Sequence, residues 1–295
     1  MALAGLVSQD CLAISAIEHP SIAEPALRLK KRGVRLNIIN VDNNGLIPDA
    51  TIDMLVKEKP NLVSIMLANN ETGVIQNLAP FAWQLRANDI KVHSDAVQAL
   101  GKIPVSFKQL GVHLMSLSSH KIYGPKGCGA LVFEKGVNIN PLFLGGDQEQ
   151  GLRAGTENAA AIVGFGKAAE LAQIELAQRN EYMTALRVKL EESLTCIPGL
   201  TIFARQANRL PNTVQIGIPG IDGEMLLMKL DQHGIAVSSG SACASGGNMP
   251  SPLLMAMGVE AGLAKSAIRI SLGMTNTATE IYEFINVLKD LVYQA

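Results

Sequence analysis

The stretch Leu114-Met115-Ser116-Leu117-Ser118-Ser119-His120-Lys121-Ile122-Tyr123-Gly124-Pro125-Lys126-Gly127 leads from an apolar segment into a polar turn rich in glycine. The apolar part predicts a buried strand, and Lys121 follows just beyond its end. An amine held there can form a Schiff base with an aldehyde, while the neighbouring hydroxyl and imidazole groups can bind a phosphate. An enzyme that uses pyridoxal 5'-phosphate (PLP) has these requirements. Taken by itself, however, Lys121 is more simply interpreted as a surface lysine before a loop.

The first half of the chain alternates apolar segments with amphipathic ones. Strands are predicted at residues 12–17, 35–40, 62–67, 91–95, 114–117 and 129–133, and helices at 22–31, 50–58 and 78–87. Apolar strands separated by helices are typical of a mainly parallel sheet that is covered on both faces. The pattern therefore predicts an α/β fold.

Polar residues gather where these strands end. They are His19, the run Asn69-Asn70-Glu71, the pair Asp95 and Gln98, and the segment 118–121. Ligands of parallel sheets bind beyond the carboxyl ends of the strands. The clustering predicts a ligand site at that edge of the sheet, and it does so independently of any one motif.

The second half of the chain has a different pattern of residues. Residues 157–194 are rich in Ala, Glu, Leu and Arg, and they predict one long helix or two in series. Strands are predicted at 200–204, 212–218 and 235–238, and a helix at 223–232. A last helix begins at the capping-box pattern formed by Thr277 and Glu280. We expect a smaller α+β domain here and place the boundary near Leu171, which gives domains of residues 1–171 and 172–295.

Composition and charge argue against some classes of partner and of cellular location. The chain has 295 residues, 48% of them hydrophobic, and a formal net charge of -1. Such a balance does not favour nucleic acid or a membrane surface as a partner. No apolar run is long enough to span a bilayer, and the first residues lack the basic region of a signal peptide. Cys11, Cys128, Cys196 and Cys243 show no metal-like spacing and no disulfide density, so we expect a cytoplasmic protein without a bound metal.

Seven short stretches follow one another along the chain in a recognisable order. They are EHPS (18–21), NNETG (69–73), HSDAVQ (93–98), SHKIYGPKG (119–127), RAGTEN (153–158), SSGSAC (238–243) and SAIRISLG (266–273). In these stretches the chain resembles the cysteine desulfurases, PLP enzymes of the class V aminotransferase group. The resemblance implies a PLP-transferase fold of type I. Residues 1–171 would then be the PLP-binding large domain, and residues 172–295 the small domain with the cysteine loop.

The resemblance also implies roles around the cofactor ring. Lys121 would hold PLP, and Asp95 would keep its pyridine nitrogen protonated; from spacing alone, Asp95 is as well explained as a helix N-cap. His19 would stack on the ring. Gln98 would bind the phenolic oxygen, and Asn70 would bind the same oxygen or the substrate carboxylate. Taken singly, these three residues are more often polar loop, turn or cap residues.

Further residues match the family's contacts with the phosphate and with the substrate. Ser118 and His120 would bind the phosphate, and His120 would also assist proton transfer. Thr156 matches a threonine that reaches the phosphate of the neighbouring subunit, which implies a homodimer; an N-cap role for Thr156 is the alternative. Arg269 would bind the carboxylate of L-cysteine through its two-pronged guanidinium, with a surface arginine as the alternative.

Cys243 decides which reaction the resemblance implies. It lies in a stretch of small residues rich in glycine, which predicts a mobile loop and not the buried position usual for a structural cysteine. As a thiolate it would take the sulfur of L-cysteine, leaving alanine and a persulfide. The acceptor would be a protein such as an iron–sulfur scaffold or a sulfur carrier.

The chain also departs from the family pattern. Two motifs that family members carry further upstream, an Asn-Ala-Ala-Thr segment and a phosphate-binding Gly-Ala-Thr-Glu turn, have no counterpart. We therefore expect an N-terminally incomplete chain with weak PLP binding. Asp147 and Gln150 stand where the family tends to have glycine and arginine. Two alternatives stay open: a non-catalytic remnant of the family, and a related PLP lyase or aminotransferase.

Overall fold

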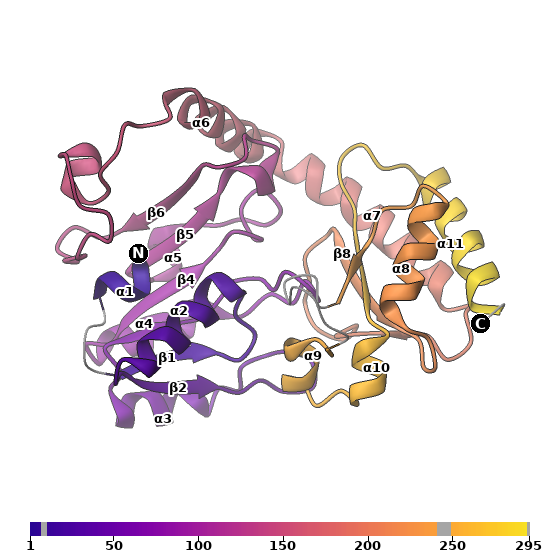
Figure 1. Cartoon of the computed structure of the whole chain (residues 1–295), viewed down its shortest axis with the longest axis horizontal. Helices are drawn as coiled ribbons and strands as arrows, with labels where there is room; N and C mark the ends of the chain where they lie inside the picture. Colours follow the sequence, from indigo (N-terminus) through magenta and orange to yellow (C-terminus); the bar gives the residue numbers. More distant parts are fainter. Residues whose placement is uncertain (7–10, 241–248, 294–295) are drawn as a thin grey trace. The chain divides into compact units, whose positions relative to one another are not determined.

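The computed structural model describes residues 1–6, 11–240 and 249–293 (Figure 1). It divides the chain into two compact units. Unit 1 comprises Met1–Asn40, Ile47–Ala68 and Gln76–Leu176. Unit 2 comprises Val41–Leu46, Asn69–Ile75 and Ala177–Ala295, so that two short segments from the first half of the sequence belong to it.

Unit 1 is built on a six-stranded sheet in the order β2-β1-β3-β4-β5-β6. The strands are β1 (Cys11–Ser15), β2 (Arg35–Ile39), β3 (Leu62–Ser64), β4 (Lys91–Asp95), β5 (Leu114–Ser118) and β6 (Gly129–Phe133). All neighbouring pairs are parallel except β5 and β6, which are antiparallel. Every residue of β1 and β3 is buried, as expected for central strands that are covered on both faces. The predicted α/β fold with a mainly parallel sheet is confirmed.

Helices and short 3-10 turns precede, connect and follow these strands. They are α1 (Ala2–Leu6), α2 (Pro20–Lys31), α3 (Thr51–Glu58), α4 (Leu78–Ala87), α5 (Phe107–Leu110), α6 (Ala159–Ile174), η1 (Ser119–Ile122) and η2 (Gln148–Gly151). The α2 helix begins with proline at its first position, and the His19 side chain accepts a hydrogen bond from the N–H of Ser21. Its apolar side packs on β1 in one cluster of buried residues.

His93 joins the three strands that position the predicted site. It lies in β4 and is fully buried. Its ring nitrogens contact Ser64 Oγ in β3 and Ser116 Oγ in β5, each at 2.9 Å. Burial lowers the pKa of His93 to about 3, so its ring stays neutral and serves as a hydrogen-bonding bridge. The bridge keeps the ends of β4 and β5 in register.

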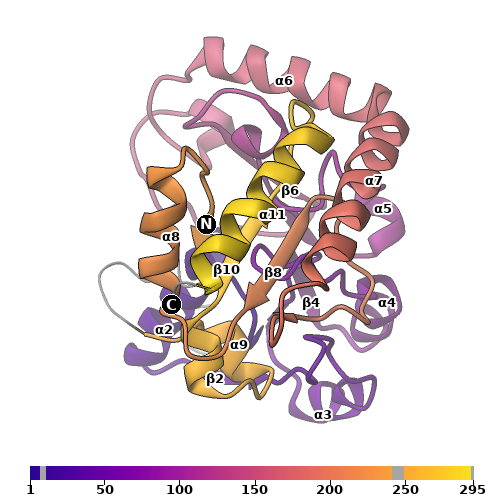
Figure 2. The same ribbon diagram turned by 90° about the vertical axis from the view of Figure 1, so that its right-hand side faces the viewer.

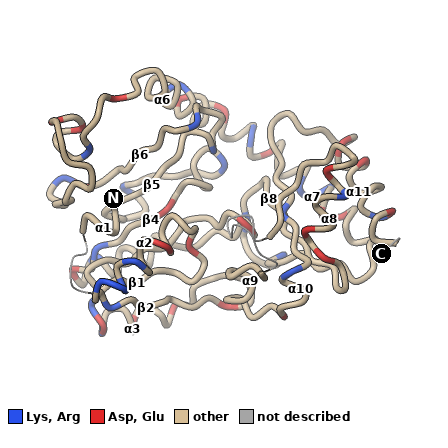
Figure 3. Tube along the Cα trace, viewed as in Figure 1, with Lys and Arg blue, Asp and Glu red and all other residues tan. Residues whose placement is uncertain are grey.

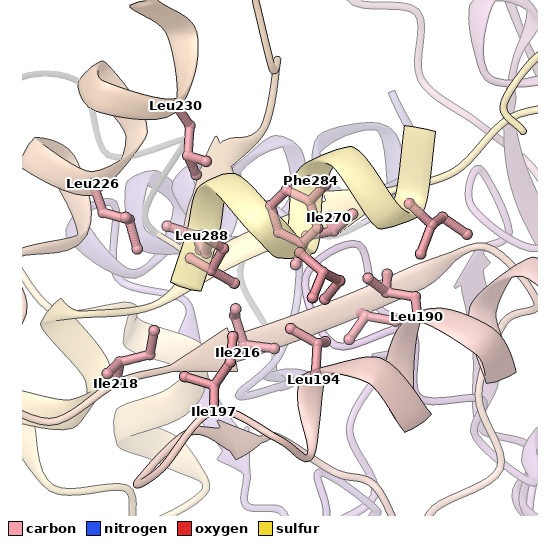
Figure 4. Packing of buried hydrophobic residues seen from close by; sticks show 14 of the residues in the cluster. Leu190, Leu194, Ile197, Ile216, Ile218, Leu226, Leu230, Ile270, Phe284 and Leu288 are labelled. Atoms are coloured by element: carbon pink, nitrogen blue, oxygen red, sulfur yellow. The ribbon is translucent and has the colours of Figure 1, made fainter. Parts of the chain in front are cut away.

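Unit 2 contains a four-stranded antiparallel sheet in the order β7-β8-β10-β9. Its elements are α7 (Leu176–Leu194), β7 (Thr201–Ile202), β8 (Thr213–Gly217), α8 (Gly223–Gln232), β9 (Ser238–Ser239), α9 (Pro252–Ala256), α10 (Ala261–Lys265), β10 (Ile268–Ser271) and α11 (Ala278–Tyr293). Figure 2 shows α11 between α7 and α8. Apolar residues of these three helices meet those of β8 and β10 in one core (Figure 4).

Most predicted elements of the second half are present. The segment 157–194 forms two helices in series, α6 and α7, on either side of Glu175. The capping box is also confirmed, because Thr277 N–H donates to Glu280 Oε2 at 2.7 Å and Glu280 N–H to Thr277 Oγ1 at 3.3 Å. The strand predicted at 235–238 is displaced, since only Ser238–Ser239 pairs with β10.

The distribution of charged residues agrees with the near-zero net charge of the chain. Lys and Arg are interspersed with Asp and Glu along both units (Figure 3). Among the described helices, none is both long and apolar enough to cross a membrane.

Candidate active site

Lys121 lies in the 3-10 turn η1, directly after β5, and its side chain is exposed. The turn ends at Tyr123, which has a left-handed backbone (φ 68°), and the N–H of Gly124 donates to the Ser119 carbonyl at 3.0 Å. Position 124 has no room for a side chain, because a Cβ there would lie 3.0 Å from the Ala168 Cβ. The glycine therefore allows a tight return of the chain, which presents Lys121 at the end of the sheet.

Ser118 and His120 form a hydrogen-bonded pair beside the lysine. Ser118 Oγ and His120 Nδ1 are 2.9 Å apart. Slight burial and the positive charges of Lys121 and Lys126 lower the pKa of His120. A neutral imidazole next to a hydroxyl can both donate and accept a hydrogen bond, which suits contact with a phosphate and with a transferred proton.

Asp95 ends β4 and has only 6% of its surface exposed. One of its carboxylate oxygens, Oδ1, accepts the Val97 N–H at 2.9 Å. Burial raises the pKa of Asp95, while this hydrogen bond and the charge of His19 act in the opposite direction. Residues 97–102 form turns and not a helix, so the helix N-cap alternative for Asp95 is wrong and the contact is a local turn.

His19 lies within electrostatic reach of both Asp95 and Lys121. Burial lowers the pKa of His19, the Asp95 charge raises it, and the Lys121 charge lowers it. Its Nδ1 is 2.8 Å from Ser21 Oγ. The three residues come from the ends of β1, β4 and β5, so the structure brings them together at one edge of the unit 1 sheet.

Gln98 and Thr156 are the remaining predicted cofactor contacts in unit 1. Gln98 lies in the turn after β4, and its side-chain oxygen accepts a hydrogen bond from Lys102 Nζ at 3.2 Å. Thr156 is exposed in the loop before α6. The N-cap of that helix is Asn158, whose side chain accepts the Ala161 N–H at 3.1 Å, so the N-cap alternative for Thr156 is wrong.

Two predicted substrate contacts lie in unit 2. Arg269 lies in β10, where alternation places it on the opposite face from the buried Ile268 and Ile270. Its Nη1 donates to the Asn70 carbonyl at 3.0 Å and its Nη2 to Ser238 Oγ at 3.1 Å. Its Nε is buried and has no hydrogen-bond partner among the described atoms. The surface-arginine alternative is therefore wrong.

Glu71 is a half-buried acid that the sequence motif did not assign. It accepts hydrogen bonds from Ser251 Oγ at 2.6 Å and from Gln215 Nε2 at 3.2 Å. Burial raises the pKa of Glu71, while these two bonds and the Arg269 charge lower it. Through Ser251, which caps α9, Glu71 is tied to the start of that helix. Cys243 itself lies outside the described residues.

The positions that depart from the family pattern lie in an exposed turn. Asp147 precedes η2, and Gln150 lies within it with φ 58°. A left-handed backbone of this kind favours glycine, and here a glutamine adopts it at some conformational cost. Within the described part of the chain, no three His, Cys, Asp or Glu residues are placed to hold a metal ion.

Glu18 is a second acid that sequence reasoning missed. The residue as a whole is half-buried, but its Oε2 is shielded from solvent and has no hydrogen-bond partner in the described chain. Its Oε1 accepts from Ser15 Oγ at 2.8 Å and from the Met66 N–H at 2.7 Å. Burial, assisted by the charge of Asp95, raises the pKa of Glu18 to about 8. Glu18 therefore keeps its proton at neutral pH, directly before His19.

This burial predicts a pH-dependent stability. Between the ordinary glutamate pKa and about 8, the folded chain holds a proton that the unfolded chain releases, so stability falls as pH rises through that window. Glu18→Gln removes the effect. We expect the unfolding free energy of the variant, relative to wild type, to increase by about 2–4 kcal/mol from pH 5 to pH 9. Chemical denaturation at both pH values measures it, with the exposed Glu24→Gln as the control. Parallel pH profiles of wild type and Glu18→Gln would contradict the assignment.

Comparison with known proteins identifies the family. The family model Aminotransferase class-V matches residues 1–284. The chain is 40% identical over 278 residues to "Cysteine desulfurase IscS" of Methanosarcina thermophila, an alignment that covers 94% of this chain and 69% of that protein. The crystal structure of a NifS-like protein from Rickettsia africae superposes with a TM-score of 0.88 at 37% identity, covering 96% of this chain and 76% of the other. The structure of SspA in complex with cysteine gives a TM-score of 0.77 at 27% identity, with coverages of 92% and 76%.

The chain therefore belongs to the class-V aminotransferases and, among them, to the cysteine desulfurase family. The family resemblance noted in the sequence is confirmed, and so is the expected PLP-transferase fold. PLP is the cofactor of this family.

Proposed function

We propose that the chain is a PLP-dependent cysteine desulfurase, which converts L-cysteine to L-alanine and leaves a persulfide on Cys243. The observation that carries the proposal is the gathering of Lys121, Asp95 and His19 at one edge of the unit 1 sheet. The remnant alternative is not favoured, because each of these side chains is present at its expected strand end. The match to cysteine desulfurases over 94% of the chain supports the same reaction.

The residues of unit 1 fit PLP. Asp95 is a buried acid whose pKa is raised by burial, a cost that the Val97 N–H and the charge of His19 offset in part. A protonated pyridine nitrogen is a cation that would offset this cost. Lys121 is exposed for a reaction with an aldehyde, and the Ser118–His120 pair offers donors for a phosphate. His19 would lie against the ring and Gln98 at its phenolic oxygen.

PLP, when bound, withdraws electrons from the α-carbon of the substrate and so makes its proton acidic. In this proposal the Lys121 amine holds the cofactor and then moves the α proton once the substrate amine has released it. His120, which has a lowered pKa, accepts or returns a proton beside it. Arg269 and Asn70 bind the substrate carboxylate, Arg269 through its planar guanidinium.

The sulfur step belongs to Cys243. Its thiolate attacks the sulfur of the substrate, a new S–S bond forms, and the C–S bond breaks. The electron pair of the broken bond stays with the carbon side, which takes a proton and leaves as alanine. The persulfide then passes its outer sulfur to a protein acceptor, such as an iron–sulfur scaffold or a sulfur carrier.

The assembly and the cellular setting are also part of the proposal. The chain would act as a cytoplasmic homodimer, in which Thr156 of one subunit reaches the phosphate of the other. Thr156 is exposed and lines a cavity of about 560 Å³ beside β6, together with Cys128 and Arg153. Residues 1–171 would be the PLP-binding domain and residues 172–295 the small domain, with no nucleic-acid or membrane partner.

A visible spectrum of the purified chain with PLP, taken before and after L-cysteine is added, tests the function. A yellow band that changes with L-cysteine, with alanine and sulfide released in equal amounts in the presence of a thiol reductant, is the expected result. Formation of a keto acid in place of alanine would indicate an aminotransferase. Absence of the band in a chain that is folded by circular dichroism would indicate a remnant.

Asp95→Asn tests the electrostatic part of the site. The amide keeps an oxygen for the Val97 N–H but loses the charge, so we expect the fold to persist. Sulfide release from L-cysteine should fall by about 10²–10³-fold in kcat/KM, because the protonated ring nitrogen loses its partner. The PLP band should remain. The exposed Asp89→Asn is the control, and a loss of less than about fivefold in Asp95→Asn would contradict the assigned role.

A further inference from the structure

Lys102 is a buried lysine beside the predicted PLP contact Gln98. Only 8% of its surface is exposed. Its Nζ donates to the Gln98 backbone carbonyl at 2.9 Å and to the Gln98 side-chain oxygen at 3.2 Å. One ammonium therefore holds both acceptors of a single residue.

This contact determines which way the Gln98 amide is turned. A lysine ammonium has three donors and no acceptor, so only the oxygen of the amide can face it. The NH₂ group of Gln98 is then directed away from Lys102. A glutamine without such a partner has no comparable preference, because its two ends have nearly the same shape.

The turn that carries Lys102 packs against the segment that carries Lys121. Gly101 has φ +72°, and a Cβ at that position would lie 2.9 Å from Ile122 Cγ2 and 3.1 Å from the Ala172 Cβ. The backbone before Lys102 therefore touches the residue that follows Lys121. Burial, together with the positive charge of Lys121, lowers the pKa of Lys102 to about 8, so Lys102 is still charged at neutral pH.

We propose that Lys102 is a positioning residue, which turns the Gln98 amide so that its NH₂ group donates to the phenolic oxygen of PLP. The inference rests on the proposed function, in which Gln98 makes that contact. A hydrogen bond donated to the phenolic oxygen stabilises its negative charge. The pKa of the nitrogen that joins PLP to Lys121 is then lower, because that nitrogen holds its proton beside the same oxygen. The hydrogen bond thereby sets the pH at which the visible band of the bound cofactor changes.

A purely structural role for Lys102 is the competing explanation. Lysine side chains often bind the last carbonyls of a turn or helix, as Lys102 does at the Gln98 carbonyl. Such a role would stabilise the turn without any effect on the cofactor. Thermal stability alone therefore cannot separate the two roles, whereas the pH midpoint of the band can.

The experiment is a double-mutant cycle. Lys102→Met is made in the wild-type chain and in Gln98→Ala, and the pH midpoint of the PLP band is measured for all four proteins. The melting temperature without PLP is recorded alongside. Gln98→Ala and Lys102→Met should each raise the midpoint by about 0.5–1 pH unit, in line with the loss of one hydrogen bond. Lys102→Met should add nothing in the Gln98→Ala background.

The other outcomes overturn the inference. An equal shift in both backgrounds would mean that the Lys102 charge acts on the cofactor directly. A lower melting temperature with an unchanged midpoint would mean a structural role only. If Lys102→Met does not fold, Lys102→Gln replaces it; its amide both donates and accepts, so a smaller rise in the same direction is expected, and no rise would contradict the inference. Lys102→Arg, which has donors only, should keep the wild-type midpoint.

The same measurements separate this inference from the proposed function. A folded wild-type chain without a lysine-dependent PLP band overturns the proposed function, and the positioning role with it. A wild-type chain that has the band, with a midpoint that Lys102→Met leaves unchanged, overturns the positioning role alone.

Discussion

Lys121→Ala is expected to abolish the PLP band and to reduce sulfide release from L-cysteine by about 10⁴-fold or more. The effect is large because the Lys121 amine both holds the cofactor and moves the α proton. The neighbouring lysines cannot replace it. Lys102 is buried against Gln98, and Lys126 lies beyond the turn at Tyr123 and Gly124.

Lys126→Ala is the matched control for this variant, because Lys126 is exposed and lies five positions away in the same polar segment. It should keep the band and most of the activity. Reduction of the PLP adduct with borohydride, followed by mass spectrometry, should place the label on Lys121. A label on Lys126, or a Lys121→Ala variant that retains the band, would contradict the assignment.

Cys243→Ala should reduce sulfide release to background, a loss of about 100-fold or more, because the sulfur then has no nucleophile to accept it. The PLP band, and its change on addition of L-cysteine, should remain, since none of the residues proposed to hold PLP or the substrate carboxylate depends on the Cys243 thiol. This combination distinguishes a desulfurase from an aminotransferase, which would be insensitive to the substitution. The measurement is sulfide release at saturating L-cysteine, together with the spectrum.

Cys196→Ala provides a matched control. Cys196 is exposed, and its thiol donates to the Ser193 carbonyl at 2.6 Å. A thiol that is merely accessible predicts no role in catalysis. Equal loss of activity in Cys196→Ala and Cys243→Ala would show that sulfur leaves by another route, and it would contradict the proposed role of Cys243.

The sequence predicted the sheet of unit 1 well, because continuous apolar strands leave a strong local signal. It also predicted Asp95, Ser118 and Lys121 at strand ends, where the structure places them. The short helices α5, α9 and α10 were missed, since segments of four or five residues are too short for a helical period to show.

Other features could not be predicted because they depend on distant parts of the chain. The segment 69–75 joins unit 2 through backbone contacts, with the Leu210 N–H bound to the Gly73 carbonyl at 2.8 Å and the Ile75 N–H to the Asn208 carbonyl at 2.9 Å. Nothing in the local sequence marks such pairing. The burial of Glu18 and Lys102 was missed for a similar reason, because a single charged residue beside a motif resembles a surface residue until its neighbours are known.

The membership of segment 69–75 in unit 2 has a consequence for synthesis of the protein. Asn70 leaves the ribosome 199 residues before Arg269, to which its carbonyl binds. Glu71 emerges 180 residues before Ser251, its hydrogen-bond donor. At about 5–20 residues per second, the nascent chain carries this loop for about 10–40 s before the last of these partners has been added. During that interval the carboxylate of Glu71 must stay in water, so unit 2 closes only near the end of translation.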